Sequence, residues 1–210
     1  MSSTEPSANA QQQQAPQLGI PGEHGRLLAR LARQAIAHRL ETGEAPPVPR
    51  NLPEPLQQTR AAFASLHHGE QLRGCMGTLI GRKPLIEQAQ ESAVEAALAD
   101  PRFEPLSRAE LDRLTLEVSV LTDPEQLWVD SEAELLERLR PGEDGLILKD
   151  GHRQATFLPA VWAHLPEPQA FIAHLKAKAG LRPDHWSPDM QVARYTSVTF
   201  TAEPPLQGAD

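Results

Sequence analysis

The residue best suited to nucleophilic chemistry is Cys75, the only cysteine among the 210 residues. It lies in the segment Leu72-Arg73-Gly74-Cys75-Met76-Gly77, whose glycines permit close approach of a ligand or of another backbone. On a regular strand Arg73 shares a face with Cys75, where a guanidinium stabilises a thiolate or binds a carboxylate or phosphate. The segment predicts a nucleophilic Cys75 with Arg73, Gly74 and Gly77 around a small anionic ligand. The alternative is a small, buried, structural cysteine.

A reactive cysteine needs a base, and the pair His67-His68 is nearest in the sequence. Residues 60–66 and 71–79 predict a β-hairpin. If residues 69–70 form its loop, Cys75 lies opposite Ala64, and His68 is four residues further along, about 13 Å away. The hairpin therefore predicts no Cys–His pair. A histidine partner would have to come from elsewhere in the fold, from His152, His164, His174 or His185.

A second set of candidates follows the alternation of apolar and polar residues in 114–120, which predicts a strand. Glu117 and Ser119 project from its polar face, which either lines a cleft or meets solvent. We take Glu117 as a candidate acid or base and Ser119 as a candidate ligand contact. Asp100 and Arg102 predict an ion pair that fixes a loop, with Arg102 as a further candidate ligand contact.

No standard metal or cofactor motif is present in the sequence. His67, His68 and Glu70 are adjacent, but neighbouring strand residues point to opposite faces. There is no helical His-x-x-x-His, no cysteine cluster, no P-loop and no Gly-x-Gly-x-x-Gly. We therefore predict no metal and no cofactor.

Bulk composition narrows the class of protein. The formal net charge is −8 and the sequence pI is about 5.5. Binding of nucleic acid needs a basic surface, so a nucleic-acid-linked regulator is the weakest functional hypothesis for this chain. Hydrophobic residues make up 40% and charged residues 23%, as in ordinary globular domains. No apolar run is long enough for a membrane span, and the start of the chain does not resemble a secretory signal. We expect a cytoplasmic protein.

Helices and strands are interspersed without a regular βαβ rhythm, which predicts an α+β fold with a mixed or antiparallel sheet flanked by helices. Expected helices cover residues 23–41, 84–99 and 168–179, and capping boxes at Ser107 and Ser131 begin two more. Further strands are expected around an Asp-Gly turn at residues 150–151 and over residues 192–202. Residues 1–20 are expected to be a disordered polar tail, residues 21–202 a single domain, and residues 203–210 a flexible tail.

Six segments, in order and with matching spacing over residues 24–200, resemble the AMMECR domain family. They are Leu-Arg-Gly-Cys-Met-Gly at 72–77, Asp-Pro-Arg-Phe-Glu-Pro-Leu at 100–106, Glu-Val-Ser-Val-Leu at 117–121, Pro-Gly-Glu-Asp-Gly-Leu at 141–146, Ala-Thr-Phe-Leu-Pro at 155–159 and Lys-Ala-Gly-Leu at 178–181. Met76 replaces the isoleucine usual in the family, a swap of similar volume.

This resemblance implies a larger and a smaller lobe with a cleft between them. It also implies a Memo-like protein and a radical SAM protein as partners, since members of the family accompany both as protein A of the AmmeMemoRadiSam system. It supplies no established reaction. Two hypotheses follow: a cleft enzyme or a component that binds a small anionic molecule in such a pathway, and a non-catalytic adaptor that docks the two partners. The sequence names neither the substrate nor the oligomeric state.

Overall fold

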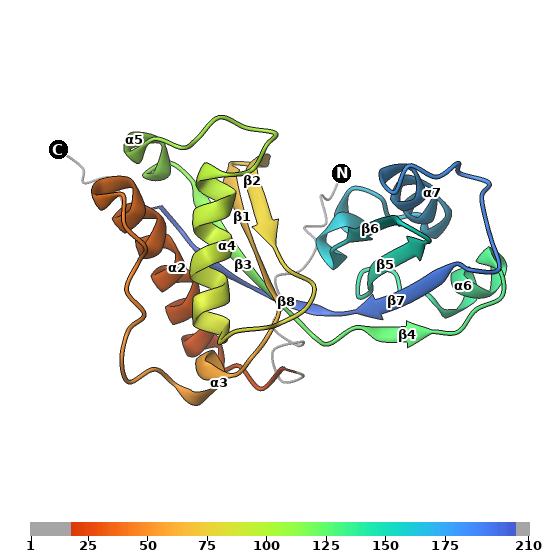
Figure 1. Ribbon diagram of the computed structural model, residues 1–210, viewed down its shortest axis with the longest axis horizontal. Coiled ribbons are helices and arrows are strands. Elements are labelled where there is room, and N and C mark those ends of the chain that lie inside the picture. The colour runs from red at the N-terminus through yellow and green to blue at the C-terminus, as the bar shows by residue number, and fades with distance from the viewer. Residues whose placement is uncertain (1–17, 205–210) are drawn as a thin grey trace, which may run out of the picture. The chain divides into compact units, whose positions relative to one another are not determined.

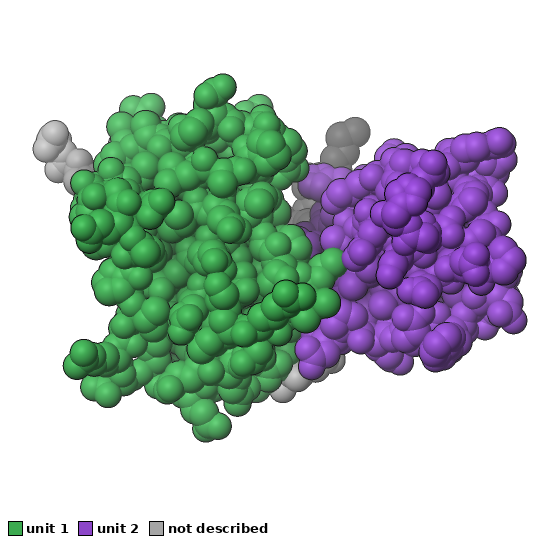
Figure 2. Space-filling model, in the orientation of Figure 1, with its two compact units in different colours: residues 1–121, 198–210 green, residues 122–197 purple. Residues whose placement is uncertain are grey.

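The computed structural model describes residues 18–204, which form two compact units joined by two chain crossings (Figure 1). Residues 18–121 and 198–204 make up unit 1, and residues 122–197 make up unit 2 (Figure 2). Each unit contains a four-stranded sheet accompanied by helices, which confirms the predicted α+β class. The two-lobe cleft and the single domain over residues 21–202 stay predictions. Within residues 18–204, no helix has both the length and the apolar character needed to cross a bilayer.

The two predicted tails lie largely outside the described residues, which exclude 1–17 and 205–210. Leu18 and Ile20 belong to the predicted N-terminal tail, yet both are buried in the core of unit 1. Both side chains are apolar, and burying them removes their surface from water. The packed part of unit 1 therefore includes residues that precede position 21.

Unit 1 contains a sheet with the strand order β2-β1-β3-β8. These strands are Ala62–His68 (β1), Gln71–Gly77 (β2), Thr115–Leu121 (β3) and Ser197–Ala202 (β8). β1 pairs antiparallel with both β2 and β3. The helices described in this unit are Gly22–Thr42 (α2), Glu54–Gln57 (α3), Leu85–Leu98 (α4) and Arg108–Leu111 (α5).

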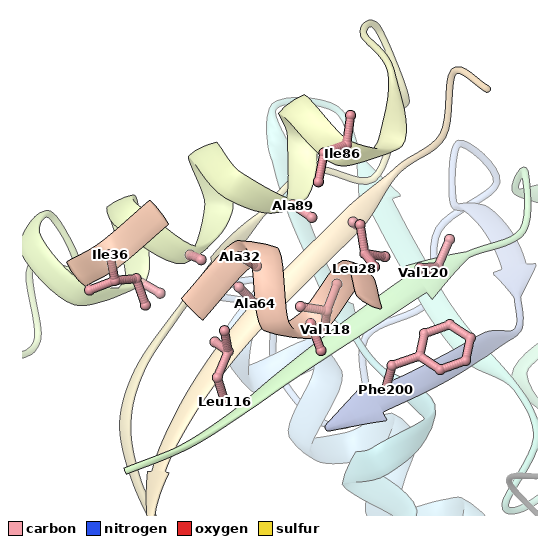
Figure 3. Close-up of a cluster of buried hydrophobic side chains, with 14 of the residues drawn as sticks. Leu28, Ala32, Ile36, Ala64, Ile86, Ala89, Leu116, Val118, Val120 and Phe200 are labelled. Atoms are coloured by element: carbon pink, nitrogen blue, oxygen red, sulfur yellow. The ribbon is translucent and has the colours of Figure 1, made fainter. Parts of the chain in front are cut away.

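Helices α2 and α4 pack on one face of this sheet and bury its apolar residues (Figure 3). Leu28 and Ile36 of α2 meet small residues such as Ala89 of α4 and Ala64 of β1 in this core. Strand side chains alternate between faces, so the residues between the buried ones point away from α2 and α4. We call that side the outer face. It carries Phe63, Ser65 and His67 of β1 and Glu117 and Ser119 of β3.

Unit 2 contains a second sheet with the strand order β4-β7-β5-β6. These strands are Glu125–Leu127 (β4), Gly145–Asp150 (β5), Arg153–Phe157 (β6) and Gln191–Tyr195 (β7). They are accompanied by Glu132–Arg138 (α6), the 3-10 helix Pro159–Ala163 (η1) and Pro168–Lys178 (α7). Trp162 stacks on Phe171 with ring centroids 3.9 Å apart in the core of this unit.

Local signals in the sequence placed most of these elements correctly. The expected helices 23–41, 84–99 and 168–179 match α2, α4 and α7 within one or two residues. Both capping boxes form, because the Ser107 and Ser131 hydroxyls accept the backbone N–H groups of Glu110 and Glu134. The expected strand 192–202 was wrong as one strand, because it breaks at Thr196 into β7 and β8, which belong to different sheets.

Candidate functional site

A β-bulge in β2 decides which way Cys75 points. His68 pairs with Gln71 across the expected two-residue loop, but the register shifts by one between Leu66 and His67. Cys75 consequently pairs with Ser65 and not with Ala64, so the predicted pairing was wrong. The shift accommodates one extra residue on β2, and that kind of insertion moves the following side chains to the other face.

This shift places Cys75 on the outer face and Met76 in the core. Ala64 is fully buried beneath the helices, and Met76 now lies opposite it and packs against the core of unit 1. Cys75 is only partly buried. Without the bulge the two side chains would exchange faces, and the thiol would lie in the apolar core.

The two glycines around Cys75 are explained by close packing. A Cβ atom on Gly74 would lie 2.1 Å from the backbone oxygen of Ala96, so glycine allows α4 to approach the sheet. A Cβ atom on Gly77 would lie 2.4 Å from the backbone oxygen of Ala62. Gly74 therefore faces α4, and the ligand contact we predicted for it would have to come from its backbone. Gly77 lies on the outer face opposite Phe63.

The thiol of Cys75 lies in a row of side chains that crosses three strands. Cys75 pairs with Ser65, which in turn pairs with Glu117 on β3. Directly opposite residues in an antiparallel sheet share one face. The Ser65 hydroxyl donates a hydrogen bond to Cys75 Sγ at 3.2 Å. The outer face therefore brings together both predicted catalytic residues, with a serine hydroxyl between them that we had not predicted.

Asp100 and Arg102 clamp the free edge of β2 at Cys75. Asp100 Oδ2 accepts the Cys75 backbone N–H at 2.9 Å, and Arg102 Nη2 donates to the Cys75 carbonyl at 3.4 Å. Arg102 also binds Asp100 through two nitrogens, Nε at 2.9 Å and Nη2 at 2.6 Å. The two side chains thus bond to the strand where a further strand would otherwise pair.

The clamp also shapes the electrostatics of the site. Hydrogen bonds from Arg102, and then from the backbone N–H groups of Cys75 and Arg102, hold the pKa of the buried Asp100 carboxyl well below its usual range. The pKa of Arg102 is raised, first by its hydrogen bond to Asp100, with a smaller contribution from Cys75. The loop-fixing ion pair predicted for these residues is confirmed, and it places a guanidinium near the thiol.

Arg73, which we predicted to accompany Cys75, is paired with Glu110 of α5. Its Nη2 atom also donates to the backbone oxygen of Glu104 at 2.9 Å, and its guanidinium lies 5.7 Å from the Phe103 ring. Its charge is therefore balanced by a carboxylate. The link between Arg102 and Cys75 could not be found by spacing, because 27 residues separate them.

His67 and Glu117 form a second polar pair on the outer face. Their side-chain atoms Nε2 and Oε2 are 3.7 Å apart, and both side chains are partly exposed. His67 lies two residues from Ser65 on the same strand and therefore points to the same face. The hairpin pairing predicted from the sequence assigned His67 no role. Ser119 also lies on this face, where its hydroxyl forms a hydrogen bond with that of Thr199.

The remaining predicted histidine partners all belong to unit 2, and His185 there binds Asp150 at 2.6 Å. Among residues 18–204, no group of three or more histidine, cysteine, aspartate or glutamate side chains is arranged to hold a metal ion.

These features define an α+β protein whose cysteine-bearing strand is bulged, clamped at its edge and packed against an alanine-rich helix. Residues 29–200 match the AMMECR1 family, and the chain belongs to that family. Protein MK0488 of Methanopyrus kandleri is 39% identical, with 87% of this chain and 90% of that protein covered. Protein MJ0810 of Methanocaldococcus jannaschii is 36% identical, with 85% and 90% covered.

A solved structure supports the same assignment. The crystal structure of the uncharacterized protein PH0010 from Pyrococcus horikoshii matches this chain with a TM-score of 0.84 and 35% sequence identity. The match covers 90% of this chain and 96% of the other. This likeness concerns fold and family, and PH0010 is itself an uncharacterised protein.

Proposed function

We propose that this protein is a thiol-dependent enzyme that acts on a small molecule, with Cys75 as its nucleophile. The observation that carries the proposal is the row Cys75–Ser65–Glu117 on the outer face of the unit 1 sheet. A nucleophile, a hydrogen-bond donor and a carboxylate on one rigid surface are the components of covalent catalysis.

Two neighbours of Cys75 favour its thiolate form. The Ser65 hydroxyl donates to Sγ, and hydrogen bonds to a charged group are stronger than those to a neutral one. Asp100 holds Arg102 near the thiol and balances its charge, as Glu110 does for Arg73, so the Ser65 hydroxyl is the stronger of the two influences on Sγ. A cation and a donor beside a partly exposed thiol are typical of reactive cysteines.

Glu117 and His67 are suited to proton transfer with a bound substrate. Cys75 and Glu117 lie two strands apart, so their Cα atoms are separated by about 10 Å. That is too far for Glu117 to deprotonate the thiol directly. It leaves room for a small molecule between the two groups. In the proposed step the thiolate forms an S–C bond at an electrophilic carbon while the bond between that carbon and the leaving group breaks, and the Glu117–His67 pair donates a proton to the atom that departs with the electron pair.

The test is the rate at which iodoacetamide alkylates Cys75. We expect the protein to react about tenfold faster than a model thiol at pH 7, because a larger fraction of Cys75 is thiolate. Ser65→Ala should slow the reaction, since it removes the donor to Sγ. Thr199→Val is the matched control: it removes a hydroxyl from β8, which does not pair with the cysteine strand, and should leave the rate within about twofold.

Alkylation no faster than that of the model thiol would refute the nucleophile. A Ser65→Ala variant that reacts as fast as the unaltered protein would remove Ser65 from the mechanism. The pH dependence of the rate separates a changed thiol pKa from changed access, because only the former moves the midpoint of the profile.

An adaptor function has one observation in its favour, the exposed Trp128 of unit 2. The residue is 81% exposed and follows β4, an edge strand. Its backbone oxygen accepts a hydrogen bond from Arg138, so the residue is fixed in place while its ring stays in solvent. Aromatic residues of this kind are enriched at protein interfaces. The family resemblance implies a Memo-like protein and a radical SAM protein as the partners.

Co-purification distinguishes the two functions. An adaptor predicts a complex with one of these partners that Trp128→Ala abolishes and Cys75→Ala leaves intact. No stable complex under native conditions, or a complex that survives Trp128→Ala, would count against this role for Trp128.

A further inference from the structure

A pocket of about 390 Å³ lies next to the cysteine row in unit 1. Its lining comprises Phe63, Gly77, Thr78, Leu79, Ile80 and Arg82. Phe63 pairs with Gly77, and these residues lie two positions from Ser65 and Cys75 on the same face. Two residues along a strand correspond to about 7 Å. A small molecule in this pocket therefore lies within reach of the thiol.

The apolar wall of the pocket is held in place by the turn that follows β2. The Thr78 N–H extends the sheet by donating to the Ala62 oxygen at 3.1 Å. Its hydroxyl accepts the Ile80 N–H at 3.2 Å and donates to the Ile80 oxygen at 3.0 Å. Ile80 is nevertheless 60% exposed. A fixed backbone therefore presents a large aliphatic side chain to solvent, where core packing does not require it.

The floor of the turn is equally constrained. A Cβ atom on Gly81 would lie 2.5 Å from the backbone carbon of Arg60, so the turn packs directly on the segment that enters β1. Only glycine fits that approach without a shift of the backbone. The pocket is thus a built feature of unit 1 and not a gap beneath a loose loop.

Arg82 supplies a charge that the rest of unit 1 leaves unbalanced. Its neighbour Lys83 forms an ion pair with Glu91 at 2.7 Å. In the part of the chain that the structure describes, Arg82 has neither an ion pair nor a hydrogen bond through its side chain. A mostly apolar lining with one unpaired guanidinium is complementary to an apolar molecule that carries one negative charge.

We infer that this pocket binds a small amphipathic carboxylate, with its apolar body against Phe63, Leu79 and Ile80 and its carboxylate at Arg82. This inference rests on the proposed function, since it names the substrate class of the same outer face. The pocket lies at the small end of the range for ligand sites, which excludes large cofactors.

The test is a titration of the full-length, ¹⁵N-labelled chain with octanoate, followed by NMR. We expect the amide signals of Gly77 to Ile80 to shift with saturation. 1-Octanol lacks the charge and should bind about fivefold more weakly, and inorganic phosphate lacks the apolar body and should leave these signals unchanged. Shifts confined to other regions, or equal affinity for octanoate and 1-octanol, would overturn the inference.

Substitutions at exposed positions test the apolar wall and the charge of the pocket separately. Ile80→Asn should weaken binding of octanoate about tenfold, and Arg82→Gln about fivefold with little change for 1-octanol. Val48→Asn and Arg30→Gln are matched controls, because both residues are exposed elsewhere in unit 1. If the controls weaken binding as much as the pocket variants do, the site is refuted.

A second probe distinguishes failure of the pocket from failure of the proposed function. In 8-bromooctanoate the carbon that bears bromine is at the opposite end of the chain from the carboxylate, and the Cys75 thiolate would attack it, forming an S–C bond and releasing bromide. We expect faster alkylation of Cys75 by 8-bromooctanoate than by 5-bromopentanoate, a primary bromide with the same charge and a shorter apolar body, and loss of the difference in Ile80→Asn. If octanoate binds but Cys75 is unreactive, the pocket stands and the proposed nucleophile fails. If Cys75 reacts rapidly without octanoate binding, the nucleophile stands and the pocket fails.

Discussion

The two β-hairpins of this protein start from the same turn and reach different outcomes. Both have two-residue loops with a glycine at φ of +59°, Gly69 in the β1–β2 hairpin and Gly151 in the β5–β6 hairpin. The β5–β6 register runs without interruption from Asp150 to Leu146. The β1–β2 register shifts after two pairs. Turn chemistry therefore fixes where a hairpin reverses, but it does not fix which residues face the core further along.

The difference bears on the proposed site because it occurs just before Cys75. In the β5–β6 hairpin, counting from the loop gives the correct partner at every position. In the β1–β2 hairpin the same counting places the cysteine in the core, and the bulge returns it to the outer face. Bulges are found beside active sites because they redirect a side chain without altering the rest of the sheet.

The largest effect that separates the two hairpins is expected for glycine substitutions. Gly74→Ala would place a Cβ atom 2.1 Å from the backbone of α4, and the helix would have to move. We expect a loss of about 3 kcal/mol in the free energy of unfolding of unit 1. Gly151→Ala meets no atom within 4 Å and strains only the positive φ, which should cost unit 2 about 1 kcal/mol.

Native-state hydrogen exchange measures these costs in each unit separately. Tryptophan fluorescence would not report the unfolding of unit 1, because all three tryptophans lie in unit 2. Equal losses in the free energy of unfolding for the two variants would show that α4 can shift away from a Cβ atom at position 74 at little cost. The close approach would then not explain why glycine occupies position 74.

Much of the fold followed from local sequence signals. Apolar periodicity located α2 and α4, and the serine capping boxes located the starts of α5 and α6. The split of residues 192–202 could not be found in this way, because strand-forming residues continue through Thr196 without glycine or proline. The break depends on a tertiary contact: Thr196 exchanges hydrogen bonds with Thr122 where the chain passes between units.

Less of the candidate site could be predicted. Cys75 and Glu117 were identified from residue type and alternation, and the sheet brings both to one face. Ser65 and His67 were missed because the bulge alters their relation to Cys75, and no local residue pattern announces it. Arg102 reaches the cysteine strand through Asp100, a contact made only by folding. Register and tertiary contact, and not residue chemistry, limited the prediction.

The two hairpins also differ in how they hold an aspartate, and Asp100→Asn tests that difference. Asp100 is buried at the edge of β2, so its replacement should destabilise unit 1 by about 2 kcal/mol at pH 7. The low pKa of Asp100 stabilises the folded state above its unfolded pKa of about 4, and this contribution is lost as the pH falls below that value. The variant should therefore lose less stability than the unaltered protein between pH 5 and pH 2.

Asp150→Asn in the β5–β6 hairpin is the matched control. The pKa of Asp150 is also lowered, first by its hydrogen bond to His185 and then by that to Ser187, but this carboxylate is more exposed. The sign of the pH effect should be the same and its size smaller. Unfolding curves at several pH values give the sign and the size of the change in the free energy of unfolding for each variant. A larger effect at Asp150 would show that the Asp100–Arg102 clamp contributes little to the stability of unit 1.

The smallest effect is expected for Met76→Ile, at a position where the bulge has moved a side chain into the core. Met76→Ile introduces the residue usual in the family and keeps the volume similar, so the free energy of unfolding of unit 1 should change by less than about 1 kcal/mol. Met76→Asp should instead be strongly destabilising, because it places a charge on the core face. Tolerance of aspartate at position 76, measured by hydrogen exchange in unit 1, would mean that Met76 faces solvent. The register without the bulge would then be the correct one, and Cys75 would belong to the core.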